Sequence, residues 1–126
     1  MRTSIRLLPP LLLVALLGCH AHTIAPKDAE RLTRAQMLDA HFTFVYDAVA
    51  SMRSNWLNVH GTDSFGTPSQ VLVYYDQTKL GGVDEMRTIT VTSITGIRHY
   101  NGTDATMRFG VGHSAGVIQI LSHRSP

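Results

Sequence analysis

The chain has 126 residues, 44% of them hydrophobic, which is enough for one small domain. Two of its eleven basic residues, Arg2 and Arg6, precede an apolar run, and the rest of the chain carries nine basic and nine acidic residues. This balance argues against a nucleic-acid partner, which needs a concentrated basic face. Cys19 is the single cysteine, so an intramolecular disulfide is excluded.

The first eighteen residues have the layout of a cleavable export signal. After the basic start, residues 7–17 form an apolar centre that is too short to span a bilayer as a permanent helix. The run ends in LLGC at residues 16–19, which resembles the lipobox of bacterial lipoproteins. The resemblance implies that the thiol of Cys19 is lipidated and that Cys19 becomes the first mature residue. The alternatives are an ordinary signal peptide with an incidental cysteine and an uncleaved anchor.

The remaining sequence predicts a tether followed by one domain. Residues 19–31 are small and polar and contain Pro26, which indicates a flexible tether. We expect the folded domain to cover residues 32–121 and residues 122–126 to form a disordered tail. Removal of residues 1–18 would leave 108 residues, which again fits one domain.

Residues 33–53 have helical periodicity, with a predicted break within residues 41–46. Thr33 is the predicted N-cap, because Gln36 three residues later completes a capping-box pattern. The apolar residues recur at three- and four-residue spacing, so they form a stripe that needs a partner surface. These residues are Met37, Leu38, Phe42, Val45, Val49 and Met52.

Three later segments predict strands. Residues 70–75 (QVLVYY) are rich in β-branched and aromatic residues, and the apolar run within them indicates an inner strand buried on both faces. Residues 96–100 and 117–121 are the other two predicted strands. Because the strands are separated by long connections, the expected fold class is α+β, a small mixed β-sheet packed with the N-terminal helices.

The connections carry their own signals. Residues 76–78 predict a turn, residues 88–91 a short strand or an extended link, and residues 92–95 a helical turn. Residues 104–108 predict a short helix, capped by Thr103 or Asp104.

Residues 70–121 also present motifs in a specific order. A strand with an Asp-containing turn precedes an apolar link, an Ile-rich strand, a Gly turn, an Ala/Arg/aromatic-Gly segment and a Gly-Val-Ile strand. This order resembles the C-terminal half of the plug domain of TonB-dependent outer-membrane receptors, and residues 32–57 resemble its helical first half. The residues that carry the resemblance are Asp76, Gly102, Asp104, Ala105, Arg108, Phe109, Gly110, Gly116, Val117 and Ile118.

The chain departs from that family in three ways. Thr103 stands where these receptors usually have proline, and residues 19–31 hold no recognisable TonB box. No barrel segment follows Pro126, so we expect a stand-alone plug without its pore, which transports nothing by itself.

The seven histidines do not predict a metal site. No pair has the HxxxH or Cys/His spacing that places ligands on one helical face, and His20 and His22 predict only weak capture of a metal. We therefore expect no bound metal and no cofactor.

Other chemical motifs are weak. His113 and Ser114, with Asp104 or Asp84, suggest a hydrolytic set, but Ser114 lacks a GxSxG context. The glycines of residues 110–116 have the wrong spacing for a dinucleotide fingerprint and precede a strand. We expect no enzymatic activity.

The spacing of two charged residues in the predicted short helix indicates a local structural role. Asp104 and Arg108 are four residues apart, a favourable orientation near a helix start. We expect them to form an ion pair.

These patterns favour a non-enzymatic, lipid-anchored protein of the cell envelope. The residue after Cys19 is His20 and not aspartate, which is compatible with sorting to the outer membrane. The expected role is an interaction or adaptor module that docks to an outer-membrane protein through its glycine-rich loops. The alternative is a periplasmic or surface module that binds a small ligand, such as a metal chelate or nutrient, in association with TonB-dependent uptake.

Fractionation with palmitate labelling tests the anchor. The wild-type chain is expected to carry the label and to sediment with membranes, whereas Cys19→Ala loses both properties because the acylated thiol is gone. A labelled Cys19→Ala variant, or a soluble wild-type chain, would refute the anchor.

Overall fold

The computed structural model describes residues 29–59 and 69–123. The predicted export signal, Cys19, most of the predicted tether and residues 124–126 of the predicted tail lie outside these ranges. The folded part begins before the predicted boundary at Leu32, because Arg31 already pairs in the sheet and the Glu30 carbonyl accepts a hydrogen bond from the amide of His99. At the other end, the last strand continues to Ser122.

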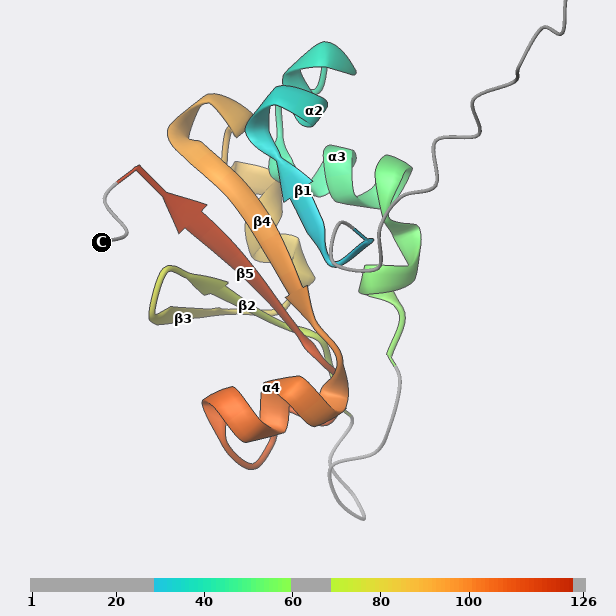
Figure 1. Cartoon of the computed structure of the whole chain (residues 1–126), viewed down its shortest axis with the longest axis vertical. Coiled ribbons are helices and arrows are strands. Elements are labelled where there is room, and N and C mark those ends of the chain that lie inside the picture. The colour runs from blue at the N-terminus through green and yellow to red at the C-terminus, as the bar shows by residue number, and fades with distance from the viewer. Residues whose placement is uncertain (1–28, 60–68, 124–126) are drawn as a thin grey trace, which may run out of the picture.

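A five-stranded sheet organises the fold (Figure 1). Its spatial order is β1-β4-β5-β2-β3, and β2 and β5 run parallel while the other neighbours are antiparallel. The predicted mixed sheet and the inner position of β2 are thus confirmed. The strands are β1 (Arg31–Thr33), β2 (Leu72–Tyr75), β3 (Thr78–Gly81), β4 (Ile94–Tyr100) and β5 (Val117–Ser122).

The turn predicted at residues 76–78 joins β2 to β3. Asp76 has a φ of 53°, a left-handed conformation that aspartate tolerates better than most residues. Its carboxylate accepts a 2.8 Å hydrogen bond from the amide of Ser122, and its own amide donates to the carbonyl of Ile120. Asp76 therefore attaches the β2–β3 hairpin to the end of β5.

The N-terminal helical region is divided as predicted. Helix α2 covers Arg34–Asp39 and helix α3 covers Val45–Met52. At the start of α2 the side chains of Thr33 and Gln36 form the capping box, in which the amide of Thr33 donates to Gln36 Oε1 at 2.8 Å. His41, with a φ of 62°, lies in the break between the helices.

Three 3-10 segments complete the connections. Ser54–Leu57 follows α3, Val83–Thr88 follows β3, and Val91–Ser93 corresponds to the helical turn predicted at residues 92–95. The extended segment before that turn forms a single bridge between Thr90 and Phe44.

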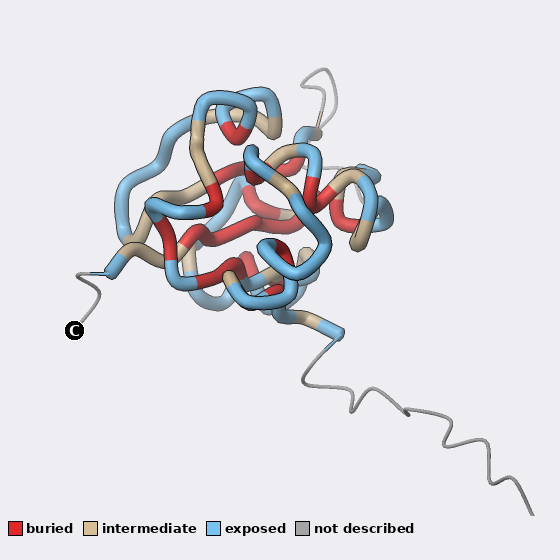
Figure 2. The backbone as a smooth tube through the Cα atoms, turned by 90° about the horizontal axis from the view of Figure 1, so that it is seen from above, coloured by how far each residue is buried: buried red, intermediate tan, exposed pale blue. Residues whose placement is uncertain are grey.

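The main core lies between one face of the sheet and the helices α2 and α3 (Figure 2). Because successive strand residues alternate between faces, Ile118 and Ile120 enter this core while Val117 faces the other side. The fully buried members with the largest side chains include Trp56, Leu32, Met37, Met86, Ile94, Ile97, Ile118 and Ile120.

The capping box makes a testable contribution to stability. Thr33→Ala removes the side-chain acceptor for the Gln36 amide, and we expect a loss of about 1 kcal/mol in the free energy of unfolding. That corresponds to a fall in Tm of about 4–8 °C for a domain of this size. Thr103→Ala is the matched control, because Thr103 is exposed within a helix, and thermal denaturation of both variants makes the comparison. Equal Tm values would contradict the role of the cap.

Candidate functional site at α4

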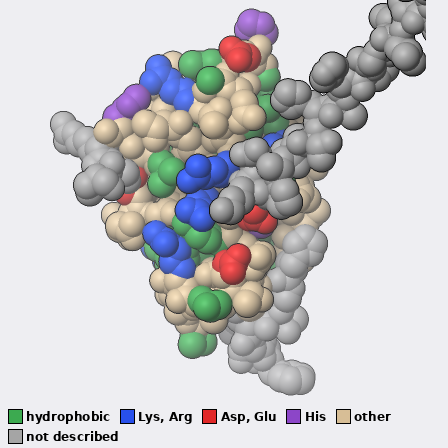
Figure 3. All heavy atoms as spheres, in the orientation of Figure 1, with side chains coloured by type: hydrophobic (Ala, Val, Ile, Leu, Met, Phe, Trp, Pro, Cys, Tyr) green, Lys and Arg blue, Asp and Glu red, His purple; other side chains and the backbone are tan. Residues whose placement is uncertain are grey.

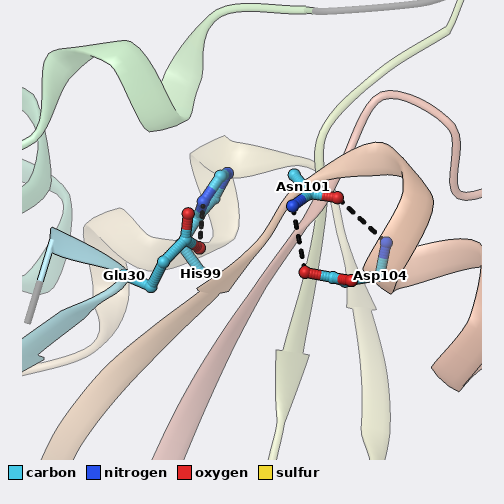
Figure 4. Close-up of polar contacts among 4 residues, drawn as sticks. All are labelled: Glu30, His99, Asn101 and Asp104. Carbon is cyan, nitrogen blue, oxygen red and sulfur yellow. Dashed lines mark hydrogen bonds and ion pairs between the residues drawn. The ribbon is translucent and has the colours of Figure 1, made fainter. Parts of the chain in front are cut away.

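Helix α4 covers Gly102–Phe109, and Asn101 is its N-cap. The Asn101 Oδ1 atom accepts a 2.9 Å hydrogen bond from the amide of Asp104, and Asn101 Nδ2 donates to an Asp104 carboxylate oxygen at 2.9 Å (Figure 4). The predicted cap, Thr103 or Asp104, is therefore wrong. The helix starts earlier than predicted because the side chain of Asn101 accepts from a first-turn amide, that of Asp104, and so acts as the N-cap.

The ion pair predicted between Asp104 and Arg108 is also wrong. The Asp104 carboxylate is engaged by Asn101, and the guanidinium of Arg108 lies over the rings of Tyr100 and Phe109, at 5.4 and 5.8 Å from their centroids. The cap holds the carboxylate at the helix start, while the aromatic faces provide an alternative partner for the cation.

A second, smaller apolar cluster fixes α4 to the sheet. Ala105 is fully buried, and the rings of Tyr74 and Tyr100 lie 4.6 and 5.4 Å from the ring of Phe109. Val117 also belongs to this cluster. It lies on the sheet face opposite the main core, so α4 and the N-terminal helices cover different faces.

His113 holds the loop that returns from α4 to β5. It is only 8% exposed, and its Nε2 lies 2.8 Å from the hydroxyl of Tyr74. Its Nδ1 lies 2.9 Å from the carbonyl oxygen of Gly110, which can only accept a hydrogen bond. Nδ1 therefore donates to Gly110, and Nε2 is hydrogen-bonded to the Tyr74 hydroxyl, so both ring nitrogens are used to hold the loop.

The residues of the suggested hydrolytic set are not brought together. Asp104 contacts Asn101, and Asp84 accepts a 2.9 Å hydrogen bond from Arg87. The hydrogen bond with Asp84 raises the pKa of Arg87. Neither carboxylate thus orients His113, whose Nδ1 is occupied by a backbone carbonyl.

Two glycines allow the close return of the chain. A Cβ atom at Gly102 would overlap the carbonyl oxygen of Ser114, so the start of α4 lies directly against the loop. Gly116 has a φ of 100°, and a Cβ there would lie 3.0 Å from the carbonyl oxygen of Tyr100. Larger residues at either position would push β4 and the loop apart.

The plug-like motif residues fall into two groups. Those from Gly102 to Gly110 form α4 and its C-terminal end, and Gly116 and Val117 lie at the start of β5 against them. Asp76 lies at the other end of β5, and Ile118 points into the main core. The motif thus describes the connection between β4 and β5 together with the two ends of β5.

Two hollows flank α4 and share Met107, which is 83% exposed. In the loop that follows α4, Val111 is 95% exposed. In Figure 3, hydrophobic side chains are visible at the lower end of the molecule, where α4 lies. A hollow of about 570 Å³ is lined by Asn101, Gly102, Thr103, Thr106, Met107 and Ser114. A groove of about 350 Å³ is lined by Glu30, Arg98, His99, Tyr100, Asp104, Met107 and Arg108.

The described histidines have separate surroundings. His99 Nδ1 lies 3.0 Å from the Glu30 carboxylate (Figure 4), and its ring stacks on Trp56. His123 contacts Arg34. Within residues 29–59 and 69–123, no three His, Cys, Asp or Glu side chains gather as a metal site, and no helix is long and apolar enough to span a bilayer. His20, His22 and His60 lie outside these ranges.

The contact between Gly102 and Ser114 generates a prediction. Gly102→Ala places a methyl group against a backbone carbonyl, so we expect a loss of about 2 kcal/mol in the free energy of unfolding, with the largest amide shifts near residue 114. Gly82→Ala is the matched control, because its Cβ would meet only the Gln70 side chain at 3.5 Å. Urea denaturation and NMR amide spectra measure both effects, and a Gly102→Ala variant as stable as the control would contradict this geometry.

In comparisons with protein-family models, curated proteins and solved structures, nothing matches this chain. The resemblance to receptor plugs stays an expectation from sequence motifs.

Proposed function

We propose that this chain is a lipid-anchored protein of the cell envelope whose plug-like domain serves as a non-enzymatic interaction or adaptor module at the outer membrane. Cys19 would carry the acyl chains, and the residues between Cys19 and Glu30 would span about 40 Å if extended. Anchoring raises the effective concentration of the domain toward other components of the same membrane. A weak contact surface is then sufficient for a specific association.

The observation that carries this proposal is the exposed apolar surface of α4 and its return loop. Met107 and Val111 project from a short helix and a loop that are held to the sheet by Ala105 and His113. Methionine is common at adaptable protein interfaces. A surface that is already ordered loses little conformational entropy when a partner covers it.

The resemblance to receptor plugs supports an outer-membrane partner. Two of the motif residues, Ala105 and Phe109, pack α4, which carries Met107, against the sheet. We propose docking alone for this partner, because no TonB box is recognised in residues 19–31.

A small-ligand module is the second candidate, because the groove and the hollow beside α4 fall within the volume range of ligand pockets. Thermal-shift screening against metal chelates and vitamins distinguishes it. A clear rise in Tm with one compound would favour the ligand-binding role over the adaptor role.

Crosslinking in cells tests the adaptor role. We expect the wild-type chain to recover one stoichiometric neighbour, and the double variant Met107→Asp/Val111→Asp to lose it because two buried charges oppose docking. Val59→Asp is the matched control, since Val59 is 51% exposed and belongs neither to α4 nor to its return loop. Recovery of the same neighbour by the double variant, or of none by the wild-type chain, would contradict the proposal.

A further inference from the structure

Three arginines lie on the sheet face that carries α4. Arg31 is on β1, Arg98 is directly opposite it on β4, and Arg108 is on α4. All three are exposed, and in the part of the chain that the structure describes none of them forms an ion pair with a carboxylate. Figure 3 shows basic side chains gathered on this face of the molecule.

The two carboxylates beside them already have partners. Glu30 contacts His99 at 3.0 Å, and Asp104 is held by the side chain and cap geometry of Asn101. Both interactions appear together in Figure 4. Within the described residues, the guanidinium groups at the groove therefore have no carboxylate partner, while the hydrogen-bonding capacity of the two carboxylates is partly used.

Arg98 and Arg108 are held at one ring. Their guanidinium carbons lie 5.0 and 5.4 Å from the centroid of Tyr100. Tyr100 is 7% exposed, and its hydroxyl donates a 3.1 Å hydrogen bond to Gln119. Because the ring is fixed, the two guanidinium groups lose less conformational freedom when they bind an anion.

The pairing of Arg31 with Arg98 is unfavourable in the free chain. Like charges directly opposite on neighbouring strands repel each other and weaken the sheet. A bound anion would relieve this repulsion, and guanidinium groups bind carboxylates through paired, charge-assisted hydrogen bonds.

We propose that the groove between β4 and α4 binds a carboxylate side chain from an acidic segment of a protein partner, through Arg98 and Arg108 with Arg31 beside them. This inference rests on the proposed adaptor function and specifies the chemistry of the partner. Glu30 and Asp104 border the groove and would repel the continuous negative charge of a membrane surface, whereas a discrete carboxylate avoids them. Met107, at the edge of the same groove, supplies an apolar contact for the rest of the segment.

Titration of the isotopically labelled full-length chain with a short acidic peptide tests the proposal. The chain is studied by NMR beside neutral phosphatidylcholine nanodiscs, with acetylated tetraglutamate amide as the probe and the tetraglutamine peptide as its neutral control. We expect saturable shifts of the amide signals of residues 98–108 with tetraglutamate only.

Variants identify the groups that bind. Arg98→Gln and Arg108→Gln are each expected to raise the dissociation constant about tenfold, because each removes a charge-assisted contact. Lys79→Gln removes the same charge from the exposed strand β3 and is expected to leave affinity within about twofold. Arg108→Lys keeps the charge but loses the forked geometry, so we expect it to fall between these values.

Four results would overturn the assignment. The first is that tetraglutamate produces no amide shifts, and the second is that Lys79→Gln raises the dissociation constant as much as the arginine variants do. The third is that shifts occur only with phosphatidylglycerol nanodiscs, and the fourth is that inorganic phosphate produces shifts when tetraglutamate does not. The peptide experiment does not depend on the neighbour captured in cells. A chain that recovers a neighbour but ignores the peptide loses only this inference, whereas a chain that binds the peptide but recovers none loses the adaptor role.

Discussion

The structure depends on how the chain returns from β4 to β5. These strands are antiparallel neighbours, yet residues 101–116 lie between them, so this long connection must begin and end at the same place on the sheet. The backbone of Gly102 meets the carbonyl of Ser114, and His113 connects Tyr74 on β2 to Gly110 in the loop. The connection is consequently a fixed platform on the face opposite the main core.

That platform explains why the surface chemistry is concentrated around α4. The aromatic rings that hold α4 to the sheet also accept the guanidinium groups of Arg98 and Arg108. Met107 and Val111 project from the same support. One set of packing contacts therefore orients the apolar residues of the proposed docking surface and the cations of the proposed carboxylate site.

Sequence patterns predicted the elements with strong local signals. The capping box at Thr33 and the inner strand β2 follow from spacing and from side-chain type, and the structure confirms both. Strands β1 and β3 were missed because each has only three or four residues, most of them exposed, so no burial pattern marks them. The cap of α4 was misplaced because an Asn-Gly pair predicts a turn as readily as a helix start.

The site was harder to predict because its groups meet only through the sheet register. Arg31 and Arg98 are distant in sequence, and the pairing of β1 with β4 alone brings them together. The four-residue spacing indicated that Arg108 would pair with Asp104. In the structure the Arg108 guanidinium instead lies over the rings of Tyr100 and Phe109, and helical spacing gives no indication of this contact. Several residues of the plug-like motif lie in the connection that builds the platform.

The platform itself is tested most directly by the protonation of the His113 ring. A long-range proton–nitrogen NMR spectrum of the histidine side chains distinguishes the two ring nitrogens. We expect a proton on Nδ1, which donates to Gly110, and an Nε2 that is hydrogen-bonded to Tyr74. A ring without a proton on Nδ1, or one that averages freely between the two tautomers, would contradict a loop held by His113.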